Sequence, residues 1–446
     1  MSAPFPRSTA LHTDRYELTM LDAALRDGTA QRRCVFELFG RRLSAGRRFG
    51  VVAGTGRLLS LIQDFRFGDD ELRFLRDERV VDAATLEFLA GFRFRGSITG
   101  YREGELYFPG SPILTIEGTF AEAVVLETLA LSVLNHDSAI ATAAARMSIA
   151  AGERPLSEMG SRRAGEESAI AAARAAYITG FGATSNLEAG RRWGIPTMGT
   201  AAHAWTLLHD SEEDAFRSQI EALGVDTTVL IDTYDIRQGV AAAVRVAGTG
   251  LGGVRIDSGD LPTVAAQVRA HLDQLGATAT KITVTSDLDE FAIAALAASP
   301  VDSYGVGTSV VTGSGTPTAG MVYKLVARQA SDGSWVAVAK SSADKSSMGG
   351  RKAAFRALQD GVATAEVVAV SDGFEQVDTA ADHPGARPLQ VQLMVEGEPD
   401  AAYQGHPGVE AARAHHVRAR HELPVRGLAL SRSDPAIPTV FVDAGS

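Results

Sequence analysis

The chain has 446 residues, and at about 150 residues per domain this length predicts two or three domains with a sizeable core. Apolar residues make up 45% and charged residues 22%, which is typical of folded globular proteins and excludes disordered and fibrous classes. Asp and Glu total 54 against 43 Lys and Arg, so the formal net charge is −11. We therefore expect no nucleic-acid partner, and any anionic ligand must meet a local concentration of cations.

The sequence shows no membrane or export signal. Its most apolar region, residues 120–149, is interrupted by five ionisable residues (Glu122, Glu127, His136, Asp137 and Arg146), so we expect no membrane span and no membrane partner. The first residues lack a basic stretch followed by an apolar one, which predicts a cytoplasmic protein. The single cysteine, Cys34, can form neither an internal disulfide nor a zinc-binding thiolate cluster, so we expect a structural role for it.

Residues 1–135 predict an N-terminal α/β domain. Strand-like segments at 33–39, 94–100 and 113–117 mix with helical segments such as 13–26, without a regular strand–helix alternation. This mixture is typical of an α+β portion of a larger protein.

Residues 136–350 predict a catalytic βα barrel. Short apolar runs that end in polar or glycine-rich residues alternate with Ala-rich amphipathic stretches. The predicted strands are 156–160, 195–199, 227–231, 253–256, 281–285 and 302–306, and the clearest helices are 168–178, 236–247, 261–275 and 289–298. Such a succession fits either a closed parallel barrel or a doubly wound sheet. The unusual polar residues follow the strands directly, which favours an irregular, TIM-like barrel with its site at the carboxyl ends of the strands.

Residues 351–446 are expected to pack back on the N-terminal domain. Strand candidates at 366–370, 389–395 and 438–442 are separated by polar loops, and no low-complexity linker divides the chain. The predicted fold class is therefore α/β, a βα barrel with an α+β N-terminal domain completed by C-terminal strands.

A glycine-rich segment after the last predicted barrel strand is a candidate phosphate site. In Gly305-Val-Gly307-Thr308, glycines allow backbone N–H groups to approach an anion, and Thr308 adds a hydroxyl donor. A loop that only turns the chain is an equally good interpretation of the spacing. Residues 248–253 fit a G-x-G-x-x-G pattern, but they precede a strand and are interpreted as a turn.

Two carboxylates and a hydroxyl follow the predicted strand at 253–256. The segment Asp257-Ser258-Gly259-Asp260 could hold ribose hydroxyls or a magnesium ion that bridges phosphates. An Asp-capped turn that opens the next helix is the alternative. Arg255 has the same parity along the strand as Asp257, so both could point inward together.

A histidine and a pair of arginines also follow predicted strands. His203 lies in Gly199-Thr-Ala-Ala-His203, near the predicted positions of Asp232 and Asp235, and an imidazole held by a carboxylate can act as acid, base or nucleophile. Arg162 and the adjacent Arg163 suit a carboxylate or phosphate ligand, although solvated charges at a helix start are the alternative.

Taken together, these segments resemble the nicotinate phosphoribosyltransferase family in both content and order. The matching segments are His12-Thr-Asp-Arg-Tyr-Glu-Leu-Thr-Met20, Gly160-Ser-Arg-Arg-Ala, Gly180-Phe-Gly-Ala-Thr-Ser-Asn186, Gly199-Thr-Ala-Ala-His203, Asp232-Thr-Tyr-Asp235, Arg255-Ile-Asp-Ser-Gly-Asp260, Gly305-Val-Gly-Thr308 and Tyr323-Lys-Leu. The resemblance implies a type II phosphoribosyltransferase fold and a homodimer with shared active sites. It implies transfer of phosphoribosyl from phosphoribosyl pyrophosphate to nicotinate in NAD biosynthesis, with ATP as co-substrate and Mg²⁺ accompanying pyrophosphate or ATP, and with no metal site built from protein ligands alone.

The resemblance also implies roles for individual residues. Tyr16 would stack on the pyridine ring, reaching into the neighbouring subunit's site, and Arg162, Thr200 and Arg255 would surround nicotinate. The catalytic residues would be His203, Asp232 and Asp257, with His203 phosphorylated by ATP and Asp232 orienting its ring. The phosphoribosyl and phosphate groups would be bound by Ser258, Gly259, Asp260, Gly307 and Thr308.

Two positions depart from the family pattern, and two alternatives remain. Gly165 and Ala204 stand where the family often has histidine and serine, so the local substrate contacts there are open. One alternative is the nicotinamide-using relative, which selects the amide with a carboxylate near the stretch matching 184–186; this chain has none there. The other is a non-catalytic nucleotide-binding regulator, which retention of His203, Asp257 and Thr308 disfavours.

Overall fold

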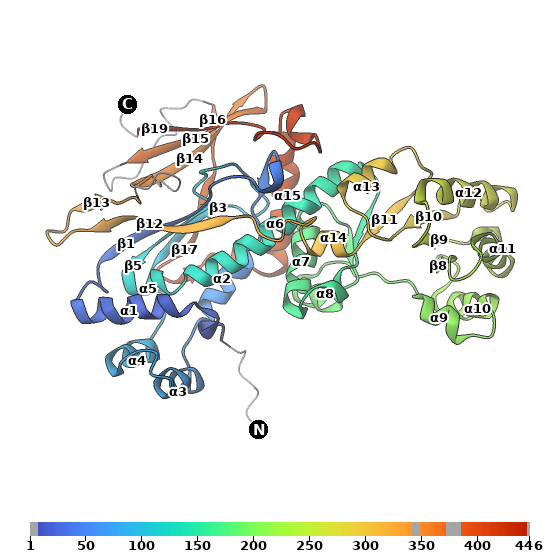
Figure 1. Cartoon of the computed structure of the whole chain (residues 1–446). Helices are drawn as coiled ribbons and strands as arrows, with labels where there is room; N and C mark the ends of the chain where they lie inside the picture. The colour runs from blue at the N-terminus through green and yellow to red at the C-terminus, as the bar shows by residue number, and fades with distance from the viewer. Residues whose placement is uncertain (1–7, 341–347, 372–384, 444–446) are drawn as a thin grey trace. The chain divides into compact units, whose positions relative to one another are not determined.

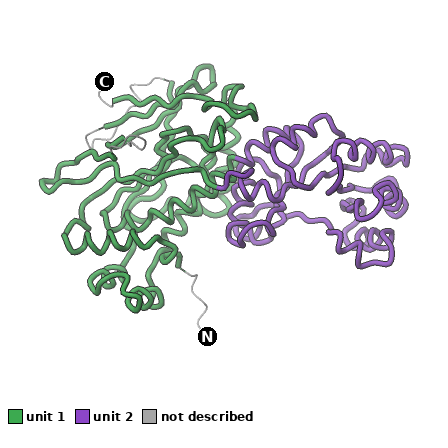
Figure 2. Tube along the Cα trace, in the orientation of Figure 1, with its two compact units in different colours: residues 1–142, 318–446 green, residues 143–317 purple. Residues whose placement is uncertain are grey.

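The computed structural model describes residues 8–340, 348–371 and 385–443 (Figure 1). The chain divides into two compact units (Figure 2): unit 1 comprises residues 1–142 and 318–446, and unit 2 comprises residues 143–317. Unit 2 thus ends before the predicted barrel boundary at residue 350, because strand β12 (Met321–Gln329) pairs with strand β1 (Arg33–Gly40) of unit 1.

Unit 1 is built on a seven-stranded sheet that joins three distant parts of the sequence. Its strand order is β13-β12-β1-β5-β3-β17-β18. The strands beside β1 and β12 are β13 (Trp335–Ala337), β5 (Leu114–Thr119), β3 (Ser97–Tyr101), β17 (Gln390–Val395) and β18 (Glu398–Pro399). Antiparallel pairing of β17 with β3 places the C-terminal segment in the same sheet as the N-terminal segment.

Two smaller sheets and a set of helices complete unit 1. A four-stranded sheet has the order β16 (Ala386–Pro388), β14 (Arg351–Gln359), β15 (Val362–Ser371) and β19 (Thr439–Asp443), and β2 (Gly50–Val51) pairs with β4 (Leu106–Tyr107). The helices are α1 (Arg15–Asp27), α2 (Thr55–Gln63), α3 (Asp69–Asp77), α4 (Ala83–Ala90), α5 (Phe120–Val124), α6 (Glu127–Ala151), which continues into unit 2, and α15 (Gly405–His421). Apolar side chains such as Leu21, Leu38 and Ile116, none of them exposed, form the core between helices and sheet.

The stretch Phe120–Ala151 is long and apolar enough to cross a membrane by length and composition alone. Two thirds of its most apolar window, 67%, is buried inside the protein, as in a core helix. Asp137 and Ser138 within α6 are fully buried and hydrogen-bonded, Asp137 to Arg57 and Ser138 to Ala53. These contacts are those of a helix that packs against protein.

Unit 2 is an α/β unit on a six-stranded parallel sheet. The strand order is β7 (Ala183–Thr184), β6 (Leu156–Glu158), β11 (Ser303–Val306), β10 (Lys281–Val284), β9 (Gly253–Ile256) and β8 (Thr228–Leu230). Its helices are α7 (Glu166–Ile178), α8 (Leu187–Trp193), α9 (His203–Leu208), α10 (Glu212–Leu223), α11 (Ile236–Ala247), α12 (Leu261–Gln274), α13 (Glu290–Ala295) and α14 (Thr308–Val311). The strands are short apolar runs with fully buried residues such as Val254 and Ile282, as expected for a parallel sheet covered by helices.

The sheet of unit 2 is open in the described residues. The predicted barrel is therefore corrected at one predicted strand. The segment 195–199, predicted as a strand, contributes only an isolated bridge between Thr197 and Thr184. Pro196 in that segment lacks a backbone N–H donor, which disfavours a longer ladder. The ladder therefore has β7 and β8 as its edges.

Candidate active site

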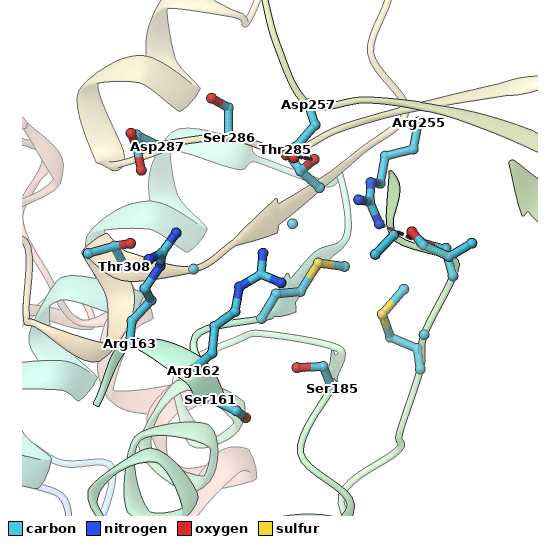
Figure 3. A pocket seen from close by; sticks show the side chains of 18 residues that line it. Ser161, Arg162, Arg163, Ser185, Arg255, Asp257, Thr285, Ser286, Asp287 and Thr308 are labelled. Carbon is cyan, nitrogen blue, oxygen red and sulfur yellow. Dashed lines mark hydrogen bonds between the residues drawn. The ribbon is translucent and has the colours of Figure 1, made fainter. Parts of the chain in front are cut away.

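A cavity of about 490 Å³ lies in unit 2 at the carboxyl ends of the parallel strands (Figure 3). Because parallel strands run in one direction, the loops that follow them meet at one edge of the sheet. The lining residues are Met159, Ser161, Arg162, Arg163, Ser185, Met198, Gly199, Thr200, Ala201, Ala202, Arg255, Asp257, Thr285, Ser286, Asp287, Gly305, Gly307 and Thr308. The cavity thus collects residues separated by up to about 150 positions in the sequence.

Arg162 and Arg163 supply positive charge on one wall. Both belong to the short turn Ser161–Arg163 that follows β6, and Figure 3 shows both side chains extending from this turn toward the cavity. Both are exposed, and neither guanidinium has a hydrogen bond or ion pair with another residue that the structure describes. A guanidinium without an internal partner is available to bind a carboxylate or phosphate through two parallel hydrogen bonds.

Arg255 faces the same cavity from β9. Its Nη1 donates a hydrogen bond to Thr200 Oγ1 at 2.5 Å, while its buried Nε has no hydrogen-bond partner in the described part of the chain. Burial lowers the pKa of Arg255, and the positive charge of Arg162 acts in the same direction, whereas Asp257 and Asp232 oppose the shift. The three residues predicted to surround nicotinate, Arg162, Thr200 and Arg255, therefore line one cavity.

Asp232 holds the turn that carries Asp257. Its Oδ2 accepts hydrogen bonds from the Asp257 backbone N–H at 2.8 Å and from Ser258 Oγ at 2.7 Å. Asp257 Oδ1 accepts a hydrogen bond from Thr285 Oγ1 at 2.5 Å. These bonds orient the Asp257 carboxylate at the cavity, where a positive charge on a ligand would be stabilised.

His203 begins helix α9 and lies beside this carboxylate. Its Nδ1 is 3.0 Å from Thr233 Oγ1 and its Nε2 is 4.0 Å from Asp257 Oδ2, and the side chain is 40% exposed. The ring is thus positioned by Thr233 and Asp257, whereas we predicted that Asp232 would orient it. Asp232 Oδ2 instead accepts from the Asp257–Ser258 turn, and Thr233 occupies the hydrogen-bonding position at Nδ1 of the ring.

Gly307 and Thr308 lie at the cavity, directly after β11. Gly305 on the strand allows close packing, because an added Cβ would lie 2.7 Å from Met159 Sδ and Thr285 Cγ2. Thr308 is exposed and, like Arg163, lines the cavity (Figure 3). Backbone, hydroxyl and guanidinium donors are therefore available together, which favours the phosphate interpretation over a simple turn.

Ser258, Gly259 and Asp260 are not among the residues that line the cavity. Asp260 accepts a hydrogen bond from the Thr263 backbone N–H at 3.1 Å and caps α12. The capping alternative therefore describes Asp260 in this structure, because helix α12 begins with unpaired N–H groups that a carboxylate satisfies. Ser258 contributes through its bond to Asp232, and Gly259 adopts a φ of +88°, which favours glycine.

Tyr16 lies on α1 in unit 1. It is 46% exposed, and burial of its hydroxyl together with the negative charge of Glu127 raises its pKa. Its phenol therefore stays protonated at neutral pH and presents a partly exposed aromatic face.

Comparison with known proteins identifies the family of this chain. Residues 11–135 match the nicotinate phosphoribosyltransferase (NAPRTase) N-terminal domain, and residues 155–363 match the nicotinate phosphoribosyltransferase (NAPRTase) family. The chain is 54% identical to nicotinate phosphoribosyltransferase pncB1 of Mycobacterium tuberculosis, over 97% of this chain and 95% of the relative. It is 40% identical to nicotinate phosphoribosyltransferase of Bacillus subtilis, over 79% of this chain and 74% of the relative.

The chain belongs to the nicotinate phosphoribosyltransferase family.

A solved structure of a family member shares the fold. The crystal structure of human nicotinic acid phosphoribosyltransferase matches with a TM-score of 0.80 at 26% identity, covering 96% of this chain and 97% of that one. Nicotinate-nucleotide pyrophosphorylase from Pyrococcus furiosus matches with a TM-score of 0.75 at 22% identity, over 95% of this chain and 99% of that one, which shows a shared fold.

Six further polar residues of this chain line the cavity: Ser161, Arg163, Ser185, Thr285, Ser286 and Asp287. Arg163, Ser286 and Asp287 follow predicted strands in the sequence, but we did not assign them individual roles. Ser286 adopts a φ of +105°, which is strained for a residue other than glycine and is typical of functional loops. That backbone conformation could not be read from the residue type, whereas the position directly after a strand was a usable signal.

Glu212 makes the stability of this unit depend on pH. Burial, followed by the charges of Asp235 and Asp232, raises the pKa of Glu212 from 4.5 to about 7, and its Oε1 is buried without a hydrogen-bond partner among the described residues. Between these pKa values the folded chain binds the proton more tightly than the unfolded chain does. The stabilising contribution is therefore complete below pH 4.5 and is lost as the pH rises through about 7.

We accordingly expect Glu212→Gln to raise Tm above that of the parent by about 3 °C at pH 8 and by less at pH 5. Differential scanning calorimetry at the two pH values measures this directly. A Tm difference that is the same at both values would contradict the assignment of the titration to Glu212.

Proposed function

We propose that this chain transfers the phosphoribosyl group from phosphoribosyl pyrophosphate to nicotinate, which yields nicotinate mononucleotide and pyrophosphate for NAD biosynthesis. The observation that carries the proposal is the single cavity that brings together Arg162, Arg163 and Arg255 in a chain of net charge −11. Such a concentration of cations is what two anionic substrates require. Family membership adds support, since relatives carry this activity in their names.

The roles of the side chains follow from charge. The nicotinate carboxylate suits Arg162 and Arg255, and the ribose phosphate suits Gly307 and Thr308 beside Arg163. The ring nitrogen of nicotinate attacks the anomeric carbon, and the bond from that carbon to pyrophosphate breaks, so its electron pair leaves with pyrophosphate. The sugar becomes positively charged in the transition state, and the Asp257 carboxylate can stabilise that charge.

Magnesium fits the cavity as a substrate-bound ion. The described ranges contain no group of three or more His, Cys, Asp or Glu side chains placed to hold a metal. Magnesium commonly uses one or two carboxylates together with phosphate oxygens and water, and Asp257 and Asp287 offer such carboxylates. When bound with pyrophosphate, the ion would neutralise charge on the leaving group.

ATP would act through His203. A nitrogen of the ring attacks the terminal phosphoryl group of ATP, ADP leaves, and water later releases phosphate from the histidine. The support is a partly exposed imidazole beside the cavity, positioned by Thr233 and Asp257. Phosphorylation would add a dianionic group there, and its discharge can couple ATP hydrolysis to substrate binding and product release.

A cytoplasmic homodimer is also part of the proposal. Leu11, Tyr16 and Met20 are all at least 37% exposed on one segment, which suits contact with a second copy and a contribution of Tyr16 to its site. The free, buried Cys34 fits a reducing compartment. Within each chain, the bridge between Thr184 and Thr197 would extend the sheet of unit 2 toward an irregular barrel. Sedimentation equilibrium measures the dimer.

One incubation tests the reaction. The purified protein is mixed with phosphoribosyl pyrophosphate and Mg²⁺, with either nicotinate or nicotinamide, with and without ATP, and the mononucleotide is identified by mass spectrometry. We expect nicotinate mononucleotide, formed faster with ATP. Equal turnover of nicotinamide would contradict the preference for the acid, and absence of any mononucleotide would favour a non-catalytic nucleotide-binding protein.

Ser185 offers a test of substrate selection. It lines the cavity directly after β7 and carries no charge that would repel a carboxylate. We expect Ser185→Asp to raise KM for nicotinate by about 10-fold to 100-fold, because like charges in a confined site cost roughly 1.4–2.7 kcal/mol. KM for nicotinamide should not rise in parallel. Ser185→Asn is the matched control, because asparagine has a volume similar to that of aspartate but carries no charge.

An equal rise of KM for both substrates in Ser185→Asp would contradict this role and indicate a steric effect.

A further inference from the structure

A second cavity, of about 280 Å³, lies entirely within unit 1. It is lined by Thr55 at the start of α2, by Arg102 and Glu103 after β3, by Tyr403, and by one side of α15. None of these residues lines the cavity of unit 2. The reaction proposed above makes no use of it.

The two arginines of this cavity have no partner among the residues that the structure describes. Arg102 and Arg418 are exposed, and the part of the chain that the structure describes offers neither guanidinium a hydrogen bond or ion pair. By contrast, most exposed arginines that form an ion pair do so with a carboxylate on their own helix, as Arg191 does with Glu188. Two unpaired guanidinium groups at one hollow are therefore free to bind an anion.

The carboxylate of Glu103 does not neutralise them. Glu103 is only 6% exposed, and its two oxygens accept hydrogen bonds from the backbone N–H groups of Gly54 and Gly56, where helix α2 begins. Negative charge is favourable at a helix N-terminus, so the start of α2 contributes to stabilising this carboxylate. Glu103 is buried, whereas Arg102 and Arg418 are exposed at the cavity.

His415 and small residues complete the cavity. His415 Nε2 lies 2.8 Å from Oε2 of Glu105. Burial acts to raise the pKa of Glu105, but hydrogen bonding to His415 and the interactions with Arg356 and Arg387 outweigh it and lower that pKa. That carboxylate is thus ionised and orients the imidazole. Gly408, Ala411, Ala412 and Ala414 present little side-chain bulk, so a ligand can approach the helix closely.

We propose that this cavity binds a small phosphate monoester, with Arg102 and Arg418 holding its phosphate group. A dianionic phosphate matches two guanidinium groups, each of which can form parallel hydrogen bonds to its oxygens. Tyr403 and the small residues of α15 offer a surface for the remainder of the molecule. A volume of about 280 Å³ restricts that remainder to a small group such as a pentose.

The test uses a thiol placed in the cavity. Ala414 is exposed and lines it, and Cys34, which is the only native cysteine, is buried with a pKa raised to about 11 by burial. The thiol of Ala414→Cys should therefore react with a maleimide while Cys34 does not. We expect ribose 5-phosphate to slow alkylation at least threefold and ribose alone to have no effect.

Replacing both arginines tests whether the protection arises at this cavity or at another binding site. In Ala414→Cys carrying Arg102→Gln and Arg418→Gln, protection by ribose 5-phosphate should disappear, while Arg76→Gln, an exposed arginine elsewhere in unit 1, should leave it intact. The parent protein reports background labelling at Cys34, and an unchanged Tm shows that each variant folds. Equal alkylation rates with and without ribose 5-phosphate, equal protection by ribose, or protection that survives loss of both arginines would overturn the proposal.

Discussion

Replacement of Arg162 by alanine should lower kcat/KM for nicotinate by about 100-fold to 1000-fold, mainly through KM. A charge-assisted pair with the nicotinate carboxylate, once the bound substrate excludes water from it, is worth roughly 3–4 kcal/mol, which converts to this factor. Arg162 has no hydrogen bond or ion pair with another described residue, so its removal leaves no buried group unpaired. Steady-state kinetics with nicotinate varied at saturating phosphoribosyl pyrophosphate measure the effect.

Two comparisons make this result specific. Arg162→Lys keeps the charge but loses the paired geometry, so we expect an intermediate loss. Arg191→Ala removes an exposed arginine that pairs with Glu188 on α8, and should leave the kinetics unchanged. If Arg162→Ala weakened nicotinamide as strongly as nicotinate, the guanidinium would not be the partner of the carboxylate.

Replacement of His203 by alanine should abolish stimulation of the reaction by ATP. The imidazole is the only ionisable ring that the described residues place beside Asp257, and alanine cannot accept a phosphoryl group. The ratio of rates with and without ATP should fall to about 1, and label from terminally labelled ATP should no longer appear in the protein as an acid-labile, base-stable adduct.

The neighbouring histidine gives a matched control. His209 ends the same helix, where its Nδ1 contacts the Trp205 carbonyl at 2.8 Å, so His209→Gln should retain both the stimulation and the adduct. Thr233→Val removes the hydroxyl that positions the ring, and should reduce labelling less than His203→Ala does. Persistent ATP stimulation in His203→Ala would contradict the role of this histidine.

Local sequence patterns predicted the strands at the site well. β9 and β10 occupy the predicted segments 253–256 and 281–285, because short apolar runs bounded by Gly and Asp specify buried parallel strands. The polar residues directly after the predicted segments, Asp257, Ser286 and Asp287, do lie at one cavity. Chain direction in a parallel sheet was enough to predict this gathering.

Long-range pairing was harder to predict. The segment 195–199 has apolar residues like the other strands, but with Pro196 it forms only one bridge. The end of the catalytic unit was also placed too late, because β12 is an ordinary apolar strand whose partner, β1, lies almost 300 residues earlier. Periodicity identifies a strand without identifying the strand with which it pairs.

The sequence by itself determined the apolar segments, the turns, the excess of negative charge and the residue types that anionic substrates require, since all of these are properties of neighbouring residues. Only the tertiary structure decided which oxygen accepts from which donor. In the folded chain, Asp232 hydrogen-bonds to the Asp257–Ser258 turn, Thr233 to His203, and Asp260 to the start of α12. Hydrogen bonds act over about 3 Å, so their partners are set by how separate strands and helices pack, and distance along the chain does not record that packing.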